Sequence, residues 1–173
     1  EALRRNAFAA INAGNSDLAE TLARRGPDPV LNKVLRGSAM ALSGNDYTFE
    51  QLNSFMSDNP NWPNLKAIQI MAEQKIPPAM PPAQVADWFM QHPPLSLVGF
   101  YRLIEAQDQL GLADQVQKAI RERWVEGDFT NDEQTAFFGR FGSLLNSDDM
   151  KARVDRLLWK NDFTQARRMM PYL

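Results

Sequence analysis

Apolar residues recur along the chain at spacings of three and four, with polar residues between them. The pattern is clearest near the end of the sequence, where three neighbouring segments each carry such a stripe. Residues three and four apart lie on one face of an α-helix. The stripes therefore predict three short amphipathic helices. Their apolar faces comprise Phe137, Phe138, Phe141, Leu144 and Leu145, then Met150, Val154, Leu157 and Leu158, and finally Phe163, Ala166, Met169 and Met170.

The same periodicity predicts helices through the rest of the chain, and no segment shows the sustained period-two alternation of a strand. The predicted helices cover residues 2–13, 17–25, 29–43, 48–57, 63–75, 83–91, 96–109 and 112–126. Two of the starts, Thr48–Gln51 and Thr130–Glu133, have the spacing of a capping box. The residues expected to face inward include Leu3, Ala7, Phe8, Ile11, Val30, Val34, Met40, Ala41, Leu65, Ile68, Met71, Ala72, Val85, Trp88, Phe89, Leu97, Phe100, Tyr101, Ile104, Val116, Ile120 and Trp124.

A helix this short cannot bury its apolar face alone, so each must stack on a neighbour. We expect an all-α fold, an α–α superhelix resembling a tetratricopeptide solenoid, with about ten or eleven short antiparallel helices in a curved array. A recurring step of Gly or Asn, then Asp, then an apolar residue supports a repeat, with copies at Gly14, Gly44, Gly127 and Asn161. The first two copies are 30 residues apart and the last two are 34 residues apart, which matches the length of a helix-pair unit. The full tetratricopeptide consensus is absent, and each copy could simply be a good turn.

The domain organisation is expected to be simple. We predict one α-superhelical domain over residues 1–173, with the proline-rich segment 76–82 as a flexible connector. The chain opens at Glu1 inside a helical pattern and stops at Leu173 just after one. We interpret both ends as cut from a longer chain.

Composition changes this picture mainly by exclusion. The formal net charge is −2 and charges of both signs are interspersed, so a strongly basic surface for nucleic acid or membrane is not indicated. A membrane-spanning helix requires about 20 consecutive apolar residues, and no apolar run in the sequence is that long. The absence of cysteine excludes disulfides, thiolate metal sites and cysteine nucleophiles. Phosphate-binding loop motifs are also absent.

Candidate catalytic and metal-binding residues are few. His92 is the one histidine, and it cannot alone form a multi-histidine metal site. Because two prolines follow it, we expect a corner histidine bonded to backbone. Asp148 with Asp149, and Glu126 with Asp128, offer the carboxylate pairs that a glycosidase needs, but each pair adjoins a helix end or turn, where acids favour the helix dipole. We therefore predict no catalytic, cofactor or metal site, and leave any binding residues unassigned.

The basic and aromatic residues are interpreted as surface and core, respectively. A nucleic-acid site would need a net basic patch with exposed aromatics interleaved. Here the basic residues alternate with acids on an expected solvated face that comprises Lys151, Arg153, Arg156, Lys160, Arg167 and Arg168. The four tryptophans, Trp62, Trp88, Trp124 and Trp159, are expected in the core. The alternative is that one of them stacks on a sugar.

A set of short segments follows a specific order and spacing over roughly residues 5–170. The earlier ones are Asn59–Pro63, Ala72–Glu73, Trp88–Phe89, His92–Pro94, Gly99, Arg123, Val125, Gly127–Phe129, Phe138 and Arg140–Gly142. The most specific part comprises Asp148, Asp149, Arg153, Asp155, Leu157, Leu158 and Trp159, followed by Ala166–Met169. Together they resemble the N-terminal superhelical, U-shaped domain of the soluble lytic murein transglycosylases. Met150 departs from that pattern, which has a histidine there, but it falls on the helix stripe.

The resemblance implies a parent enzyme in which a curved α-superhelix precedes a lysozyme-like catalytic domain. Such enzymes cleave the peptidoglycan β-1,4 bond between N-acetylmuramic acid and N-acetylglucosamine, leaving a 1,6-anhydro end, with one glutamate of a Glu-Ser motif as acid and then base. This chain contains no Glu-Ser dipeptide and no Gly-Leu-Met-Gln segment, so no catalytic residue is carried over. The resemblance thus implies an inactive periplasmic scaffold, made with a signal peptide, that positions the catalytic domain in cis and the peptidoglycan strand.

Two other functions stay open at this point. A free-standing tetratricopeptide-like adaptor would bind a protein or peptide in its concave groove. The third hypothesis is an enzyme that uses carboxylates in a way that no motif reveals.

Overall fold

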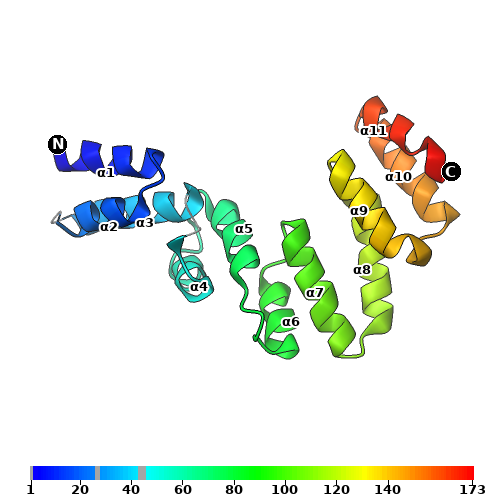
Figure 1. Cartoon of the computed structure of the whole chain (residues 1–173), viewed down its shortest axis with the longest axis horizontal. Helices are drawn as coiled ribbons and strands as arrows, with labels where there is room; N and C mark the ends of the chain where they lie inside the picture. The colour runs from blue at the N-terminus through cyan, green and yellow to red at the C-terminus, as the bar shows by residue number, and fades with distance from the viewer. Residues whose placement is uncertain (1, 26–27, 43–45) are drawn as a thin grey trace. The chain divides into compact units, whose positions relative to one another are not determined.

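The computed structural model describes residues 2–25, 28–42 and 46–173, and the regular structure over these residues is entirely helical (Figure 1). The α-helices are α1 (Ala2–Asn12), α2 (Ser16–Arg25), α3 (Pro29–Leu42), α4 (Phe49–Asp58), α5 (Leu65–Lys75), α6 (Pro82–Gln91), α7 (Leu97–Gln109), α8 (Ala113–Glu126), α9 (Asn131–Phe141), α10 (Ser147–Trp159) and α11 (Phe163–Arg168). Two 3₁₀ turns follow late in the chain, η2 (Gly142–Leu144) and η3 (Met170–Tyr172). The predicted all-α fold of about ten or eleven short helices is confirmed.

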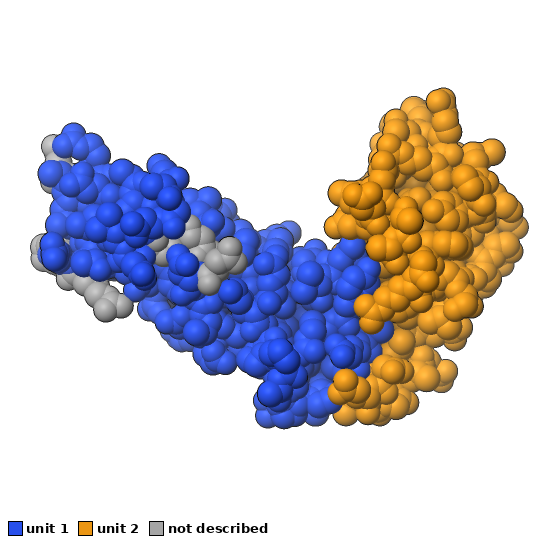
Figure 2. Space-filling model, in the orientation of Figure 1, with its two compact units in different colours: residues 1–106 blue, residues 107–173 orange. Residues whose placement is uncertain are grey.

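The chain divides into two compact units, Glu1–Ala106 and Gln107–Leu173, which are described separately (Figure 2). The division falls inside α7. The proline-rich segment 76–82 lies within the first unit, and it is non-helical until Pro82 begins α6. Ile76 is buried there, and the Pro77 carbonyl accepts a hydrogen bond of 3.1 Å from Arg102 Nη2. The curvature expected of the whole array stays a prediction.

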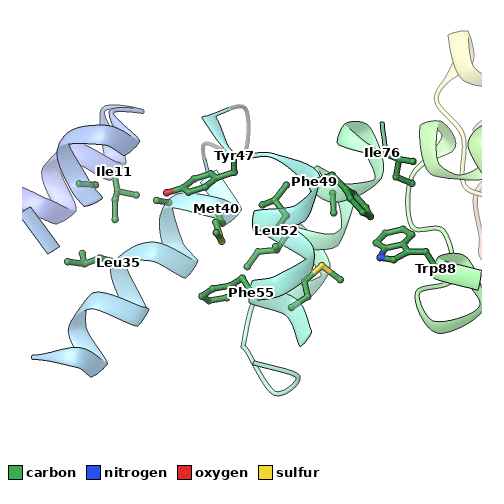
Figure 3. Close-up of a cluster of buried hydrophobic side chains, with 14 of the residues drawn as sticks. Ile11, Leu35, Met40, Tyr47, Phe49, Leu52, Phe55, Ile76 and Trp88 are labelled. Atoms are coloured by element: carbon green, nitrogen blue, oxygen red, sulfur yellow. The ribbon is translucent and has the colours of Figure 1, made fainter. Parts of the chain in front are cut away.

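The first unit buries a continuous apolar cluster. Helix α1 packs on α2 and α3, and α5 packs on α3 and α4. Side chains from successive helices meet in the cluster, and Figure 3 labels Ile11, Leu35, Met40, Tyr47, Phe49, Leu52, Phe55, Ile76 and Trp88. Many of the predicted inward residues are buried here, but Phe8 is 39% exposed and Val30 is 69% exposed. Val30 precedes the buried Leu35 by five residues, which places it about 140° around the helix.

The second unit is built around Trp124 of α8, whose side chain is fully buried. Its indole ring lies 5.9 Å from the ring of Phe137 on α9 and 6.2 Å from that of Tyr172 in η3. The predicted inward residues Val116, Ile120, Phe137, Phe141, Met150, Leu157, Ala166 and Met169 are buried as well. Leu144, Leu158, Phe163 and Met170 are instead exposed. Helix α11 has only six residues, and it buries Ala166 alone.

Three turns between helices share one geometry. Gly14, Gly111 and Asn161 have positive φ angles of 71°, 74° and 59°. Each donates its N–H to the carbonyl three residues back, and the following residue donates to the carbonyl five back, as in a Schellman C-cap. Gly127 has a φ of −72° and does not belong with them, and the copy at Gly44 lies outside the described residues. The recurring feature is thus a left-handed residue, and not the Gly-Asp step itself.

Candidate functional site

Arg153 of α10 is buried, with 1% of its surface exposed. Its Nη1 donates to the carbonyl oxygens of Trp124, at 2.6 Å, and Gly127, at 2.9 Å. Its Nη2 donates to Gln134 Oε1 at 3.2 Å. The guanidinium carbon also lies 4.8 Å from the ring centroids of Trp124 and Phe129. One side chain therefore holds α10 against the end of α8, the following turn and α9.

The prediction that Arg153 lies on a solvated face is wrong. Arg153 follows the buried Met150 by three residues and precedes the buried Leu157 by four, so it shares their face. Carbonyl oxygens and ring faces replace the water that a buried cation loses. Burial lowers the pKa of Arg153 to about 10, so the group stays protonated at neutral pH. Other members of the basic run are exposed as predicted: Lys151, Lys160, Arg167 and Arg168.

The candidate carboxylate pairs have structural partners, as predicted. Asp149 Oδ2 accepts the N–H of Asn146 in a capping box and the Nε–H of Arg121, both at 2.8 Å. Arg156 pairs with Glu126 at 3.2 Å and with Asp128 at 2.8 Å. Hydrogen bonds from Arg156 and Lys160 lower the pKa of the Asp128 carboxyl. These acids stabilise helix ends and the turn between α8 and α9.

Glu73 on α5 forms a second buried polar contact that the sequence did not reveal. Its carboxylate accepts the backbone N–H groups of Leu95 and Ser96, both at 2.8 Å, and the Ser96 hydroxyl. Gln69 Nε2 donates to it at 3.0 Å. Gly99 packs so closely that a Cβ there would overlap the carboxylate. Glu73 thus fixes the start of α7 on α5, and nothing in its local pattern separates it from a surface glutamate.

His92 is a corner histidine bonded to backbone, as predicted. Its Nδ1 lies 3.0 Å from the Trp88 carbonyl oxygen, and its ring stacks on the Trp88 indole at 4.7 Å between centroids. The indole N–H of Trp88 donates to Asn53 Oδ1 at 2.7 Å. In the part of the chain that the structure describes, no His, Cys, Asp and Glu cluster has the arrangement of a metal site. None of the described helices has the length and hydropathy of a membrane span.

A cleft of about 510 Å³ opens in the first unit among α2, α3 and α4. Its lining combines two cations, two acids, amides and one aromatic ring, namely Glu20, Asn32, Lys33, Arg36, Ser54, Phe55, Asp58 and Asn59. Charges of both signs match a zwitterionic ligand such as a peptide better than a phosphate.

Three of the four tryptophans belong to packed regions and one does not. Trp88 and Trp124 are buried, and Trp62 is half-buried with its ring edge-on to Phe55 at 5.2 Å. Trp159 is 87% exposed, so the prediction of a core position is wrong for it. It follows the buried Leu157 by two residues, which turns its side chain about 200° away from the core.

Trp159 lines a shallow hollow of about 540 Å³ at the end of α10, together with Asp155, Leu158 and Asn161. The cleft of the first unit and this hollow are two of several hollows that the described residues line; another lies between α8 and the start of α10. Comparison with protein-family models, curated proteins and solved structures finds no match to the chain.

Proposed function

We propose that this chain is the non-catalytic superhelical scaffold of a periplasmic lytic transglycosylase. In this proposal it positions the catalytic domain of the parent enzyme and helps hold the peptidoglycan strand that the enzyme cleaves. The catalytic glutamate belongs to another part of the parent enzyme. A chain of this kind binds murein without cutting it.

The observation that carries the proposal is the role of the residues behind the resemblance. Glu73 and Gly99 join the start of α7 to α5, and Arg153 joins α10 to the carbonyl of Gly127. His92 caps α6 through the Trp88 carbonyl. Residues scattered along the sequence thus converge on helix-to-helix contacts, as expected for the determinants of a scaffold.

The acids of the most specific segment support the same conclusion. Asp149 caps α10 and pairs with Arg121. Asp148 pairs with Lys151 at 3.5 Å. A general acid for glycoside cleavage needs a raised pKa and a position beside the scissile bond. Acids engaged in caps and ion pairs fit a structural role better.

The test is a sedimentation assay with purified, insoluble murein sacculi, run beside a digestion assay. The chain is expected to sediment with the sacculi at physiological ionic strength and to release no soluble anhydro-muropeptides. An unrelated helical protein of similar size and charge is the control. Failure to sediment above that control, or muropeptide release by the chain alone, would contradict the proposal.

A second candidate function is peptide binding in the cleft of the first unit. Lys33 and Arg36 on α3 face the same cleft as Glu20 and Asp58, which suits a zwitterionic segment. The test is selection of binding peptides from a displayed random library, followed by titration with the K33A/R36A variant. A Lys66→Ala variant is the control, since Lys66 is exposed on α5 and outside the cleft. Equal affinity in the two variants would remove this candidate.

A further inference from the structure

The exposure of Trp159 is unusual for this side chain. Tryptophan contributes one of the largest apolar surfaces of any residue, and it is usually buried over most of that surface. Trp124, on the same unit, is fully buried, whereas Trp159 is 87% exposed. An exposed indole offers a ligand a large flat apolar face together with one N–H donor.

The hollow around Trp159 has polar groups that are available to a ligand. Asp155 lies one helical turn before the tryptophan, and Asn161 lies in the left-handed turn after it. Within the described residues, neither side chain takes part in a hydrogen bond or an ion pair of the protein. The described lining includes no lysine or arginine, which disfavours a phosphate or a nucleic acid strand.

The backbone that carries Trp159 is fixed by the fold. Leu157, two residues earlier, is buried, and the N–H groups of Asn161 and Asp162 bond to the carbonyls of Leu158 and Leu157. Lys160 pairs at 3.0 Å with Asp128, in the turn between α8 and α9. A ligand at the hollow therefore does not have to order this part of the backbone.

We propose that the Trp159 hollow binds one sugar ring of a glycan strand. The carbon–hydrogen face of the sugar stacks on the indole, and hydroxyl or amide groups at its edge exchange hydrogen bonds with Asp155 and Asn161. A single aromatic ring flanked by a neutral amide and a carboxylate matches a neutral sugar in size and polarity. A stable protein interface would bury about 800 Å² on each partner, far more than this hollow offers. The inference rests on the proposed scaffold function for its choice of glycan.

The experiment compares wild type with Trp159→Ala, Trp159→Phe and Met90→Ala. Met90 is 81% exposed on α6, outside the hollow, so its variant controls for the loss of any exposed apolar side chain. Each protein is titrated with murein sacculi by sedimentation and with soluble N-acetylglucosamine oligomers by acrylamide quenching of tryptophan fluorescence. Trp159 is the most accessible tryptophan, so a bound sugar is expected to protect wild-type emission from the quencher.

Trp159→Ala is expected to weaken sacculus binding about three- to tenfold, the range of a single aromatic stacking contact. Trp159→Phe is expected to lie between this variant and wild type, and Met90→Ala to match wild type. Circular dichroism is expected to be the same for all four proteins, because neither mutated side chain lies in the core.

The outcomes separate the two proposals. If wild type binds sacculi and Trp159→Ala binds equally well, the sugar site is overturned and the scaffold function stands. If wild type does not bind sacculi, the scaffold function fails and the sugar site fails with it. If Trp159→Ala instead abolishes concentration-dependent self-association of the chain, Trp159 belongs to a protein interface and the sugar site is also overturned.

Discussion

At the scale of single residues, the fold depends on polar side chains in places where apolar ones are usual. Arg153 satisfies two backbone carbonyls and one side-chain amide while its planar face covers two aromatic rings. A lysine could not reproduce this geometry, since its ammonium is a compact point charge without a planar fork. A charged residue has therefore become part of the core, because its hydrogen bonds replace hydration.

The first prediction concerns Arg153→Ala. Truncation leaves the carbonyls of Trp124 and Gly127 without this donor and opens a cavity, so the free energy of unfolding is expected to fall by about 3–5 kcal/mol. Urea denaturation followed by circular dichroism measures the change. Arg168→Ala, at an exposed position of the same unit, is expected to change stability by less than about 0.5 kcal/mol. A loss below about 1 kcal/mol for Arg153→Ala would show that the buried contact is not needed.

The second prediction concerns pH and Asp128. Hydrogen bonds from Arg156 and Lys160 lower the pKa of this carboxyl in the folded protein. A depressed carboxyl pKa contributes stability that is complete above the unfolded value of about 3.9 and is lost as the pH falls through the folded pKa. Because Asp128 is mostly exposed, Asp128→Asn is expected to cost less than about 1 kcal/mol at neutral pH.

Urea titrations of wild type and Asp128→Asn across the acid range provide the measurement. The stability difference is expected to shrink once the pH falls below about 4 and to vanish below the folded pKa. Added salt is expected to reduce it at neutral pH as well. If the stability difference between wild type and Asp128→Asn stays constant down to the lowest pH, Asp128 acts through its shape and not its charge.

At the scale of elements, local caps set some helix ends, and a contact from another helix sets the start of α7. The capping boxes at Thr48 and Thr130 form as the sequence predicts, with reciprocal side-chain and backbone hydrogen bonds. Helix α7 starts differently, because the carboxylate of Glu73 reaches it from α5. Gly99, in the first turn of α7, leaves the room for that carboxylate.

The third prediction uses two glycines that differ in their surroundings. Gly99→Ala would place a methyl group against Glu73, so a loss of about 1–3 kcal/mol is expected. Gly139, inside α9, has open space around it, so Gly139→Ala is expected to stabilise by about 0.5–1 kcal/mol through helix propensity. Thermal and urea unfolding of both variants give the comparison. Equal effects at the two positions would contradict the crowding at Gly99.

Periodicity in the sequence was enough to predict the helices and most of their buried faces, because each face repeats over several turns. The predicted burial is wrong at helix ends, where the position of a residue in a single turn decides whether its side chain is covered. Val30 lies in the first turn of α3, and Trp159 closes α10 on its outer side. The charge of Arg153 suggests a solvated position, whereas its place between Met150 and Leu157 puts it on the buried face of α10.

The candidate site was less accessible to sequence reasoning. The roles of His92 and of Asp149 could be predicted, because their hydrogen bonds are local. The cleft of the first unit brings Glu20, Asn32 and Ser54 together from three helices, and no local pattern records that meeting. The Trp159 hollow is formed within one helix end, but a core position is the default expectation for tryptophan, and Trp159 lies off the apolar stripe of its helix.

At the scale of the whole molecule, each compact unit has a core of its own. The apolar cluster of the first unit draws on α1 to α7, whereas the second unit centres on Trp124 and the rings of α9. Stability in stacked-helix proteins is approximately a sum of local terms. A substitution in one core should therefore loosen its own unit most.

The fourth prediction tests this locality by hydrogen exchange on the whole 173-residue chain. Arg153→Ala is expected to raise amide exchange rates in α8, α9 and α10 well above those of wild type, with smaller changes in α3 to α5. Gly99→Ala is expected to reverse the order, because its crowded partner Glu73 belongs to α5. Local opening free energies follow from such rates. Because Arg153→Ala destabilises the second unit and Gly99→Ala the first, each variant serves as the control for the other. An equal rise in exchange rates throughout the chain in both variants would mean that the two cores open together. The chain would then unfold as a single cooperative unit, and its stability would not be a sum of local terms.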